Sequence, residues 1–487
     1  MSEMSRLSKL EPGDVFSYFD EICHIPHGSG NTGQISDYCL RFAKEHGLAC
    51  RQEPCGNVVI WKDASPGCED ADPVMLQGHL DMVAVETEDC GIDLETEGLR
   101  PAVSEDGEWV YAKGTSLGGD DGIAIAYAMA ILADDTLKHP PLEAVFTVSE
   151  EIGLMGATAL DASDLKSRIL LNIDSETEGE FLTSCAGGAT FCCFLPSRRE
   201  KKTGIVYEFM IDGLLGGHSG MEAHLGRANA NVLFGRFLAE TAGKAAYQIG
   251  EFSGGEKENA IPVRCSAILL TDEENAESLK RAADEFAAAV KSEYASIEPD
   301  ITVTLTRKEI CEADVLDSEG DRALRIALEL MPAGVLRMEP DMPGMVQTSL
   351  NLGVLRSEPE STLTYAVRSS VRTQREWMLT RMRDVAALAG GSSKVEGVYP
   401  AWPYRPDSRI REIMGKTYEE LTGKKPVMTG VHAGVECGIL AEKLPGIDCI
   451  SYGPTMQNIH TVRERLNIRS VQRNYELTKR VLEKLVL

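Results

Sequence analysis

Short apolar runs alternate with amphipathic helical patterns over the first part of the chain, to about residue 185. Four runs have the length and composition of buried strands: 57–61, 74–77, 144–148 and 169–173. Two segments have helical spacing: 34–45 and 122–133. Such alternation is typical of a mixed, mainly parallel sheet that helices cover on both faces. We therefore predict an α/β fold for this region.

The pattern changes near residue 187, where glycine-rich turns appear among an α+β set of segments. This set comprises predicted helices at 229–242 and 276–292 and predicted strands at 301–306 and 362–369. The α/β pattern returns after Pro400, with predicted helices at 408–422 and 470–487 and a strand at 448–452. The 487 residues exceed the roughly 250–300 that one hydrophobic core accommodates. We predict an α/β domain formed by 1–186 and 396–487, with a second domain inserted at 187–395.

Composition argues against several classes of partner. The net charge of -27, from 49 basic and 76 acidic residues, repels nucleic-acid phosphates and anionic lipid. No stretch approaches the roughly 20 apolar residues of a membrane span, and the N-terminus has no signal-peptide pattern. The 13 cysteines lack the spacing of a disulfide framework, which is typical of reduced thiols. We expect a soluble cytoplasmic protein that binds neither nucleic acid nor membranes.

Ionisable residues follow the predicted strands. In MLQGHLDMV, His79 and Asp81 stand two residues apart, so in an extended segment both side chains point the same way. This spacing suits a histidine ligand whose second ring nitrogen is held by a carboxylate, although an ordinary turn is the alternative. In the glycine-rich turn GTSLGGDDGIAIA, Asp120 and Asp121 directly precede a predicted helix. Capping the helix would need only one of these two carboxylates.

Three further segments repeat this pattern. Glu150 and Glu151 come immediately after a predicted strand, where successive side chains project in opposite directions. One carboxylate can then bind a metal ion while its neighbour takes a proton; solvated surface glutamates are the alternative. Asp174 ends the apolar run in LLNIDSETEG, and His460 lies a short loop beyond the predicted strand at 448–452.

Taken together, these residues predict a two-metal hydrolytic site, because ligand sites in open α/β sheets form at the carboxyl ends of strands. Two imidazoles and three carboxylates suit zinc, and manganese or cobalt could substitute. Two divalent ions would balance three carboxylates and a bridging hydroxide, and one glutamate of the pair 150–151 would serve as the general base. The predicted ligands are His79, Asp120, Glu151, Asp174 and His460.

Several segments resemble a known family. GHLDMV, GGDDG, SEEIG, NID and NIH, in this order, are similar to motifs of the di-zinc metallopeptidase family of carnosinases, dipeptidases and amino-acid deacylases. Three longer segments resemble its aminoacyl-histidine dipeptidase branch: 213–230, 429–440 and 452–466. The resemblance spans essentially the whole chain and implies hydrolysis of Xaa-His and other unblocked dipeptides. The alternatives are a tripeptidase or an N-acyl-amino-acid deacylase on this scaffold. A non-catalytic peptide-binding relative is disfavoured, because all five ligands and the base are present.

The resemblance also implies how these residues divide their roles. Asp120 would bridge the two ions and precede a cis peptide bond. Asp81 would orient His79, and Glu150 would act first as base and then as acid. The ligands would pair as His79 with Asp174 at one ion and Glu151 with His460 at the other.

The resemblance further implies that the inserted domain acts as a lid. In many relatives this domain also mediates dimerisation, so we expect a homodimer formed through it. His218, in GGHSG, matches a lid histidine that stabilises the tetrahedral oxyanion; a local hydrogen bond in a glycine loop is the alternative. Many relatives carry an Asp-x-Arg strand where this chain has Ala366-Val367-Arg368, and Gly-Thr-Asp where it has the segment 432–436. The candidates for binding the peptide substrate are Arg368, Asn229 and, for its amine, Glu436.

Overall fold

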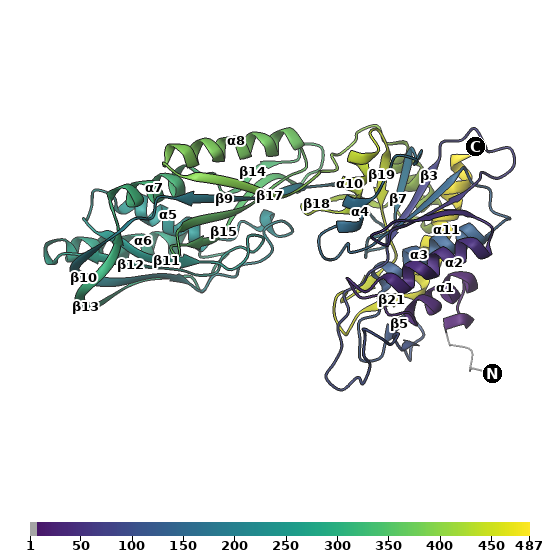
Figure 1. The fold of residues 1–487 in the computed structure, drawn as a ribbon, viewed down its shortest axis with the longest axis horizontal. Coiled ribbons are helices and arrows are strands. Elements are labelled where there is room, and N and C mark those ends of the chain that lie inside the picture. Colours follow the sequence, from purple (N-terminus) through teal and green to yellow (C-terminus); the bar gives the residue numbers. More distant parts are fainter. Residues whose placement is uncertain (1–6) are drawn as a thin grey trace. The chain divides into compact units, whose positions relative to one another are not determined.

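The computed structural model describes residues 7–487 and separates into two compact units (Figure 1). The first unit holds the chain up to Cys185 together with Tyr404–Gly430 and Val435–Leu487. The second holds Ala186–Pro403 and Val431–Gly434. The predicted boundary at 395 differs from the observed one, because residue 395 falls inside a strand that pairs within the second unit.

An eight-stranded mixed sheet forms the first unit (Figure 1). Its four central strands run parallel in the order β6-β3-β7-β19, and antiparallel strands flank them. The predicted mixed α/β fold is thus confirmed, with parallel pairing confined to the centre. The strands in sheet order are β1 (Ala49–Gln52), β2 (Val58–Lys62), β6 (Leu142–Thr147), β3 (Val74–His79), β7 (Ile169–Asn172), β19 (Asp448–Ser451), β8 (Glu180–Cys185) and β18 (Val427–Val431).

Helices and a small second sheet complete the first unit. The helices are η1 (Leu7–Lys9), α1 (Gly13–Cys23), α2 (Gly33–Glu45), α3 (Gly119–Ala133), α4 (Met155–Ala159), α9 (Arg409–Thr422), α10 (Glu436–Lys443) and α11 (Ile468–Leu485). The four-stranded sheet has the order β20 (Met456–Gln457), β21 (Arg465–Asn467), β5 (Trp109–Ala112) and β4 (Pro101–Val103). It was not predicted, because its strands are at most four residues long and carry no sustained alternation.

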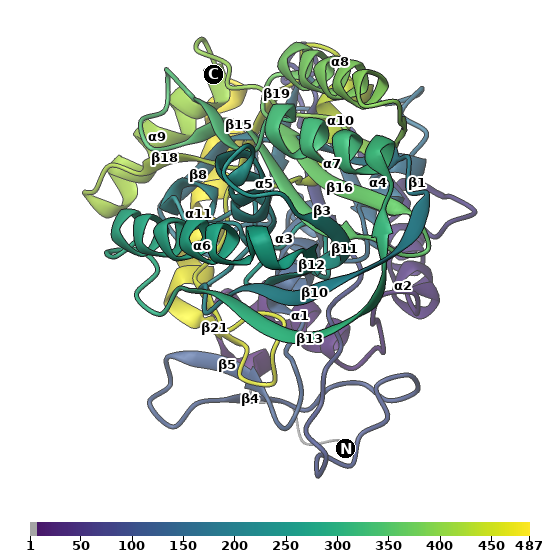
Figure 2. The same cartoon turned by 90° about the vertical axis from the view of Figure 1, so that its left-hand side faces the viewer.

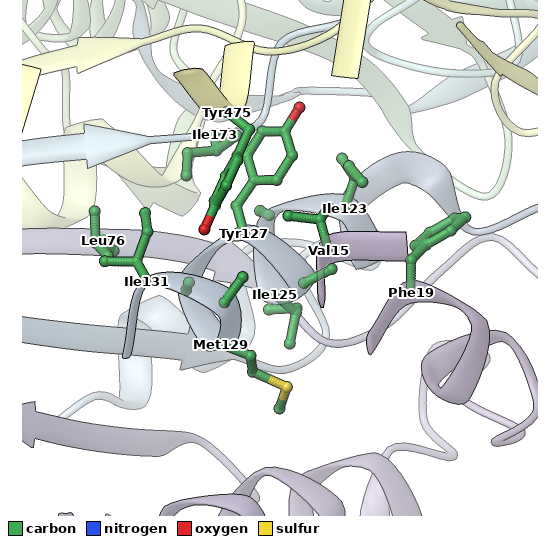
Figure 3. Close-up of a cluster of buried hydrophobic side chains, with 14 of the residues drawn as sticks. Val15, Phe19, Leu76, Ile123, Ile125, Tyr127, Met129, Ile131, Ile173 and Tyr475 are labelled. Carbon is green, nitrogen blue, oxygen red and sulfur yellow. The ribbon is translucent and has the colours of Figure 1, made fainter. Parts of the chain in front are cut away.

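Helix α3 lies at the centre of this unit, between β3 and α1. Apolar side chains surround it on all sides, which agrees with a sequence that has no polar face (Figure 3). Val15 and Phe19 contribute from α1, Leu76 from β3 and Tyr475 from α11. The Tyr127 hydroxyl donates to the carbonyl of Val471 at 2.8 Å. This packing fixes the first turn of α3, which carries Asp120 and Asp121.

Gly78 lets the end of β3 approach that turn closely. A Cβ atom at Gly78 would lie 2.5 Å from Ala124 Cβ and 2.6 Å from Asp121 Oδ2, so no larger residue fits without displacement. The Asp121 carboxylate accepts the His79 N–H at 3.2 Å. The glycine therefore places the last residue of β3 beside the start of α3.

A nine-stranded antiparallel sheet forms the second unit, and four helices cover one of its faces (Figures 1 and 2). The strands are β9 (Gly187–Leu195), β10 (Arg199–Asp212), β11 (Gln248–Gly254), β12 (Cys265–Thr271), β13 (Thr302–Leu316), β14 (Gly334–Met338), β15 (Val346–Arg356), β16 (Ser361–Ser369) and β17 (Ser392–Tyr399). The helices are α5 (Ala230–Thr241), α6 (Glu273–Glu293), α7 (Ser318–Leu330), α8 (Arg372–Leu388) and the short η2 (Ala223–Leu225). None of the helices in residues 7–487 is long and apolar enough to cross a membrane.

Candidate metal centre

The central strands of the first unit end at one edge of the sheet, and the predicted ligands gather there. His79 is the last residue of β3, Asp174 follows β7, and Glu151 follows β6. His460 lies in the loop between β20 and β21, and Asp120 lies in the first turn of α3. The structure thus brings all five predicted ligands together, as expected for the carboxyl ends of parallel strands.

Two groups of three ligand atoms share Asp120. In one, atoms of His79, Asp120 and Asp174 all lie within 4.8 Å of one another, and in the other atoms of Asp120, Glu151 and His460 do so. Asp120 Oδ1 is 3.0 Å from His79 Nε2, and Asp120 Oδ2 is 3.1 Å from His460 Nε2. One carboxylate therefore faces both groups, which is the arrangement of a ligand that bridges two ions.

The His79 ring is oriented as a metal ligand needs. Its Nδ1 lies 2.8 Å from the carbonyl oxygen of Asp81, which can only accept, so the neutral ring carries its proton on Nδ1. The lone pair of Nε2 then faces Asp120 Oδ1 at 3.0 Å and Asp174 Oδ1 at 3.6 Å. Three acceptor atoms facing one another require a cation or a proton between them.

Burial makes negative charge costly for several of these carboxylates. Burial is the main cause that raises the pKa of Glu150 to about 9, and it also raises the pKa of Asp174. Burial acts on Asp120 too, but the imidazoles of His460 and His79 beside it, when they are protonated, outweigh burial and hold its pKa below the usual range. Divalent cations would offset the cost of burying these negative charges, and imidazole nitrogens with carboxylate oxygens suit such cations. The residues present therefore fit two divalent cations.

Asp81 holds the turn that carries the two glutamates. Its Oδ1 accepts the Glu150 N–H at 2.9 Å, and its Oδ2 accepts the Glu151 N–H at 3.4 Å and the Ser29 hydroxyl at 2.8 Å. The carboxylate is 3.7 Å from His79 Nδ1, so the ring's close contact is with the Asp81 carbonyl instead. The predicted contact between Asp81 and His79 thus involves mainly the main chain, and the side chain of Asp81 positions the base.

Glu150 and Glu151 do not continue β6, contrary to the alternation predicted for them. The strand ends at Thr147, and Ser149 has a left-handed backbone with φ 55° that turns the chain before Glu150. The described chain has four such non-glycine residues, and all lie in the two loops of this site: Ser149, Leu154, Asn458 and His460. Each costs about 1–3 kcal/mol, which is typical of functional loops held by their surroundings. The Asp120–Asp121 peptide is cis, as the family resemblance implied.

The second unit holds His218 in a defined protonation state. Its Nδ1 accepts the backbone N–H groups of Gly220 at 3.2 Å and Met221 at 2.9 Å. Burial, aided by Arg368, lowers the pKa of His218. The neutral ring therefore carries its proton on Nε2, which makes that nitrogen a hydrogen-bond donor.

Arg368 and His432 lie around the same glycine loop. A Cβ atom at Gly220 would meet His218 Cε1 at 3.1 Å, Arg368 Nε at 3.2 Å and the His432 carbonyl oxygen at 2.3 Å. Arg368 donates from Nη1 to the Tyr399 hydroxyl at 2.8 Å, whereas its buried Nε has no hydrogen-bond partner within residues 7–487. His432 was not predicted as a site residue; the signal available was its place in the segment 432–436, where the sequence departs from many relatives.

Asn229 and Glu436 are engaged within their own units. Asn229 caps α5, its Oδ1 accepting two backbone N–H groups and its Nδ2 donating to Asn351 Oδ1 at 3.0 Å. Glu436 is fully buried, and its Oε2 accepts from Gln77 at 2.5 Å and Thr147 at 2.7 Å. Glu436 has no exposed surface, whereas Asn229 is half-buried, and the substrate-binding roles of both residues stay predictions.

Comparisons with known proteins point to peptidases. The model of peptidase family M20/M25/M40 matches residues 75–484. The cytosol non-specific dipeptidase of Escherichia coli (strain K12) is 35% identical over 485 residues, which cover 99% of each chain. The crystal structure of aminoacylhistidine dipeptidase from Vibrio alginolyticus superposes with a TM-score of 0.94 at 38% identity, covering 99% of each chain. Aminopeptidase PepT from Bacillus cereus ATCC 10987 shares the fold, with a TM-score of 0.56 at 15% identity over 98% of this chain and 100% of its own.

Proposed function

This chain belongs to peptidase family M20/M25/M40, and we propose that it hydrolyses unblocked dipeptides, Xaa-His dipeptides among them, with two divalent cations. The observation that carries the proposal is the position of Asp120 between two ligand groups, which also contain His79 and His460. The relatives suggest the substrate class, since the Escherichia coli protein is a dipeptidase and the Vibrio alginolyticus protein an aminoacylhistidine dipeptidase.

The ligand set divides between the two ions. His79 and Asp174 would hold one cation, Glu151 and His460 the other, and Asp120 both. We propose zinc for both positions, with manganese or cobalt able to substitute, because imidazole nitrogen and carboxylate oxygen suit these metals. When bound, such ions lower the pKa of water and polarise a peptide carbonyl.

Glu150 would carry out the proton transfers. It takes a proton from the attacking water and later delivers it to the nitrogen of the leaving amine. Its backbone N–H is held by Asp81, and the side chain of its neighbour Glu151 is directed to His460 at 2.7 Å. This division leaves one glutamate to bind a cation and the other to move a proton.

His218 and Arg368, which lie in the second unit, would keep the substrate-binding roles that the family resemblance implies. His218 offers its Nε2–H to the oxyanion of the tetrahedral intermediate, a contact worth about 3–4 kcal/mol in comparable sites. Arg368 would offer its guanidinium to the C-terminal carboxylate of the dipeptide, as the family resemblance suggests. Both groups are fixed before the substrate arrives, by the contacts of the His218 ring with its own loop and of Arg368 with Tyr399.

A substrate panel tests the proposed class. We expect the zinc-loaded protein to hydrolyse carnosine, other Xaa-His dipeptides and further unblocked dipeptides, and to act poorly on tripeptides and N-acetylated amino acids. Amine release from each substrate, measured at equal concentrations, gives the comparison. Preferred cleavage of tripeptides would favour the tripeptidase alternative, and preferred cleavage of acetylated amino acids would favour the deacylase.

Arg368→Lys is expected to raise the KM of dipeptides about 10-fold with a smaller change in kcat, because lysine lacks the planar fork that binds a carboxylate. A dipeptide amide, which has no C-terminal carboxylate, should be affected much less. Arg356→Lys is the matched control, since the Arg356 guanidinium donates to the carbonyls of Gly254 and Gly255. An equal rise in KM for the dipeptide and its amide would contradict the role given to Arg368.

We also propose a cytoplasmic location. The 13 cysteines are all free thiols, which suits a reducing compartment, and the Escherichia coli relative is named for the cytosol. Dimer formation through the second unit stays a prediction.

A further inference from the structure

We propose that Glu464 is a positioning residue of the metal centre, holding the loop that presents Asp120 to both cations. The inference rests on the proposed two-cation site, but it concerns the binding of the ions and not the choice of substrate. Glu464 was not among the predicted site residues.

The Glu464 carboxylate is surrounded by backbone donors from one loop. Its Oε2 accepts the N–H groups of Leu117 at 2.8 Å and Gly118 at 3.1 Å. Its Oε1 accepts the N–H of Gly119 at 2.8 Å and faces that of Asp120 at 3.5 Å. Only 3% of Glu464 is exposed, so water does not compete for these contacts. The side chain thus binds four consecutive residues that lead into the shared ligand.

These N–H groups need an acceptor, because the first turn of a helix leaves its donors unpaired. Helix α3 begins at Gly119, and its N-cap residue is Gly118, which has φ 66° and no side chain to supply a cap. A negative charge at this helix end is also favoured by the helix dipole. Glu464 therefore acts as a cap supplied from a distant part of the chain.

The same loop that carries Glu464 also carries His460. The Glu464 N–H donates to the Thr461 carbonyl at 3.0 Å, and β21 begins at the next residue and pairs with β5. His460 Nε2 lies 3.1 Å from Asp120 Oδ2. One anchored loop thus contacts Asp120 at both its backbone and its carboxylate. The relative position of His460 and Asp120 depends on the Glu464 contacts, so loosening these contacts should weaken cation binding.

A purely structural role is the alternative, and Glu143 provides the comparison. Glu143 is 4% exposed, and its carboxylate accepts the N–H groups of Lys166 at 2.9 Å and Ser167 at 3.0 Å. It lies near the start of β6, at the end of the strand opposite Thr147. Glu143 is therefore a buried carboxylate of the same kind that holds a loop away from the ligands.

The test is a zinc titration of metal-free protein against a chelating dye, for wild type, Glu464→Gln and Glu143→Gln. In Glu464→Gln an amide N–H₂ replaces one of the accepting oxygens. We expect the affinity for both ions to fall about 10–100-fold in that variant, the usual effect of losing a group that orients a ligand. Glu143→Gln should keep wild-type zinc affinity even if its thermal stability falls.

Two results would overturn the role of Glu464: wild-type zinc affinity in Glu464→Gln, or an equal loss in Glu143→Gln. Circular dichroism of the metal-free proteins reports folding. If Glu464→Gln does not fold, Glu464→Asp takes its place; this variant keeps the charge but shortens the reach, and wild-type affinity in it would likewise overturn the inference. Failure of the wild-type protein to bind zinc, manganese or cobalt would instead overturn the proposed two-cation site itself.

Discussion

Glu150→Gln is expected to lower kcat about 10²–10⁴-fold while the protein keeps its full complement of metal ions. Glutamine has nearly the same shape but cannot take a proton from water. The backbone N–H of residue 150 would still donate to Asp81, so the turn should keep its conformation. Steady-state kinetics on an Xaa-His dipeptide and elemental analysis of the same sample give the two quantities.

The adjacent glutamate provides the matched control. Glu151→Gln should lose metal as well as turnover, because Glu151 lies in the ligand group with Asp120 and His460. Near-normal kcat in Glu150→Gln would contradict its role as base. Loss of metal from Glu150→Gln to the same degree as from Glu151→Gln would show that the two glutamates do not divide their roles.

Asp120→Asn is expected to lose both ions, and with them at least about 100-fold in turnover, because one change removes a ligand from both groups. An amide brings no negative charge and offers only one oxygen where the carboxylate offers two. The stoichiometry of bound zinc, measured by elemental analysis after dialysis at a fixed free zinc concentration, reports the loss.

Comparison of Asp174→Asn with Asp120→Asn distinguishes a ligand that serves a single ion from one that bridges two. Asp174 belongs only to the group with His79 and Asp120, so its amide variant should keep the ion held by Glu151 and His460. Equal loss of bound zinc in Asp120→Asn and Asp174→Asn would contradict the bridging role of Asp120. Two tightly held ions in Asp120→Asn would contradict it as well.

That the proposed ligands lie close together could be predicted, because their positions follow from chain order and strand direction. Each apolar run that ends in a histidine or carboxylate forms a parallel strand of one sheet, and parallel strands end at the same edge. His79 and Asp174 were placed in this way. The boundary at 395 was less accurate, because the hydrogen bonds of β17 to β9 link segments about two hundred residues apart, and local pattern does not report them.

Other parts of the site depend on contacts that no local pattern encodes. Glu464 binds the backbone of residues far away in sequence, and backbone N–H groups leave no signature in side-chain identity. Asp81 was predicted from its spacing to His79, yet its carboxylate mainly holds Glu150. Asn229 and Glu436 were proposed from the family resemblance; both side chains make local hydrogen bonds, and their binding roles stay predictions.

The central claim is that two cations held around Asp120 make this chain a dipeptidase. The most direct measurement assays metal-free protein on an Xaa-His dipeptide while Zn²⁺ is returned in measured equivalents, with bound zinc determined on each sample. We expect no turnover without metal and full turnover when two ions are bound per chain. Turnover by the metal-free protein, or none after two ions are bound, would contradict the claim.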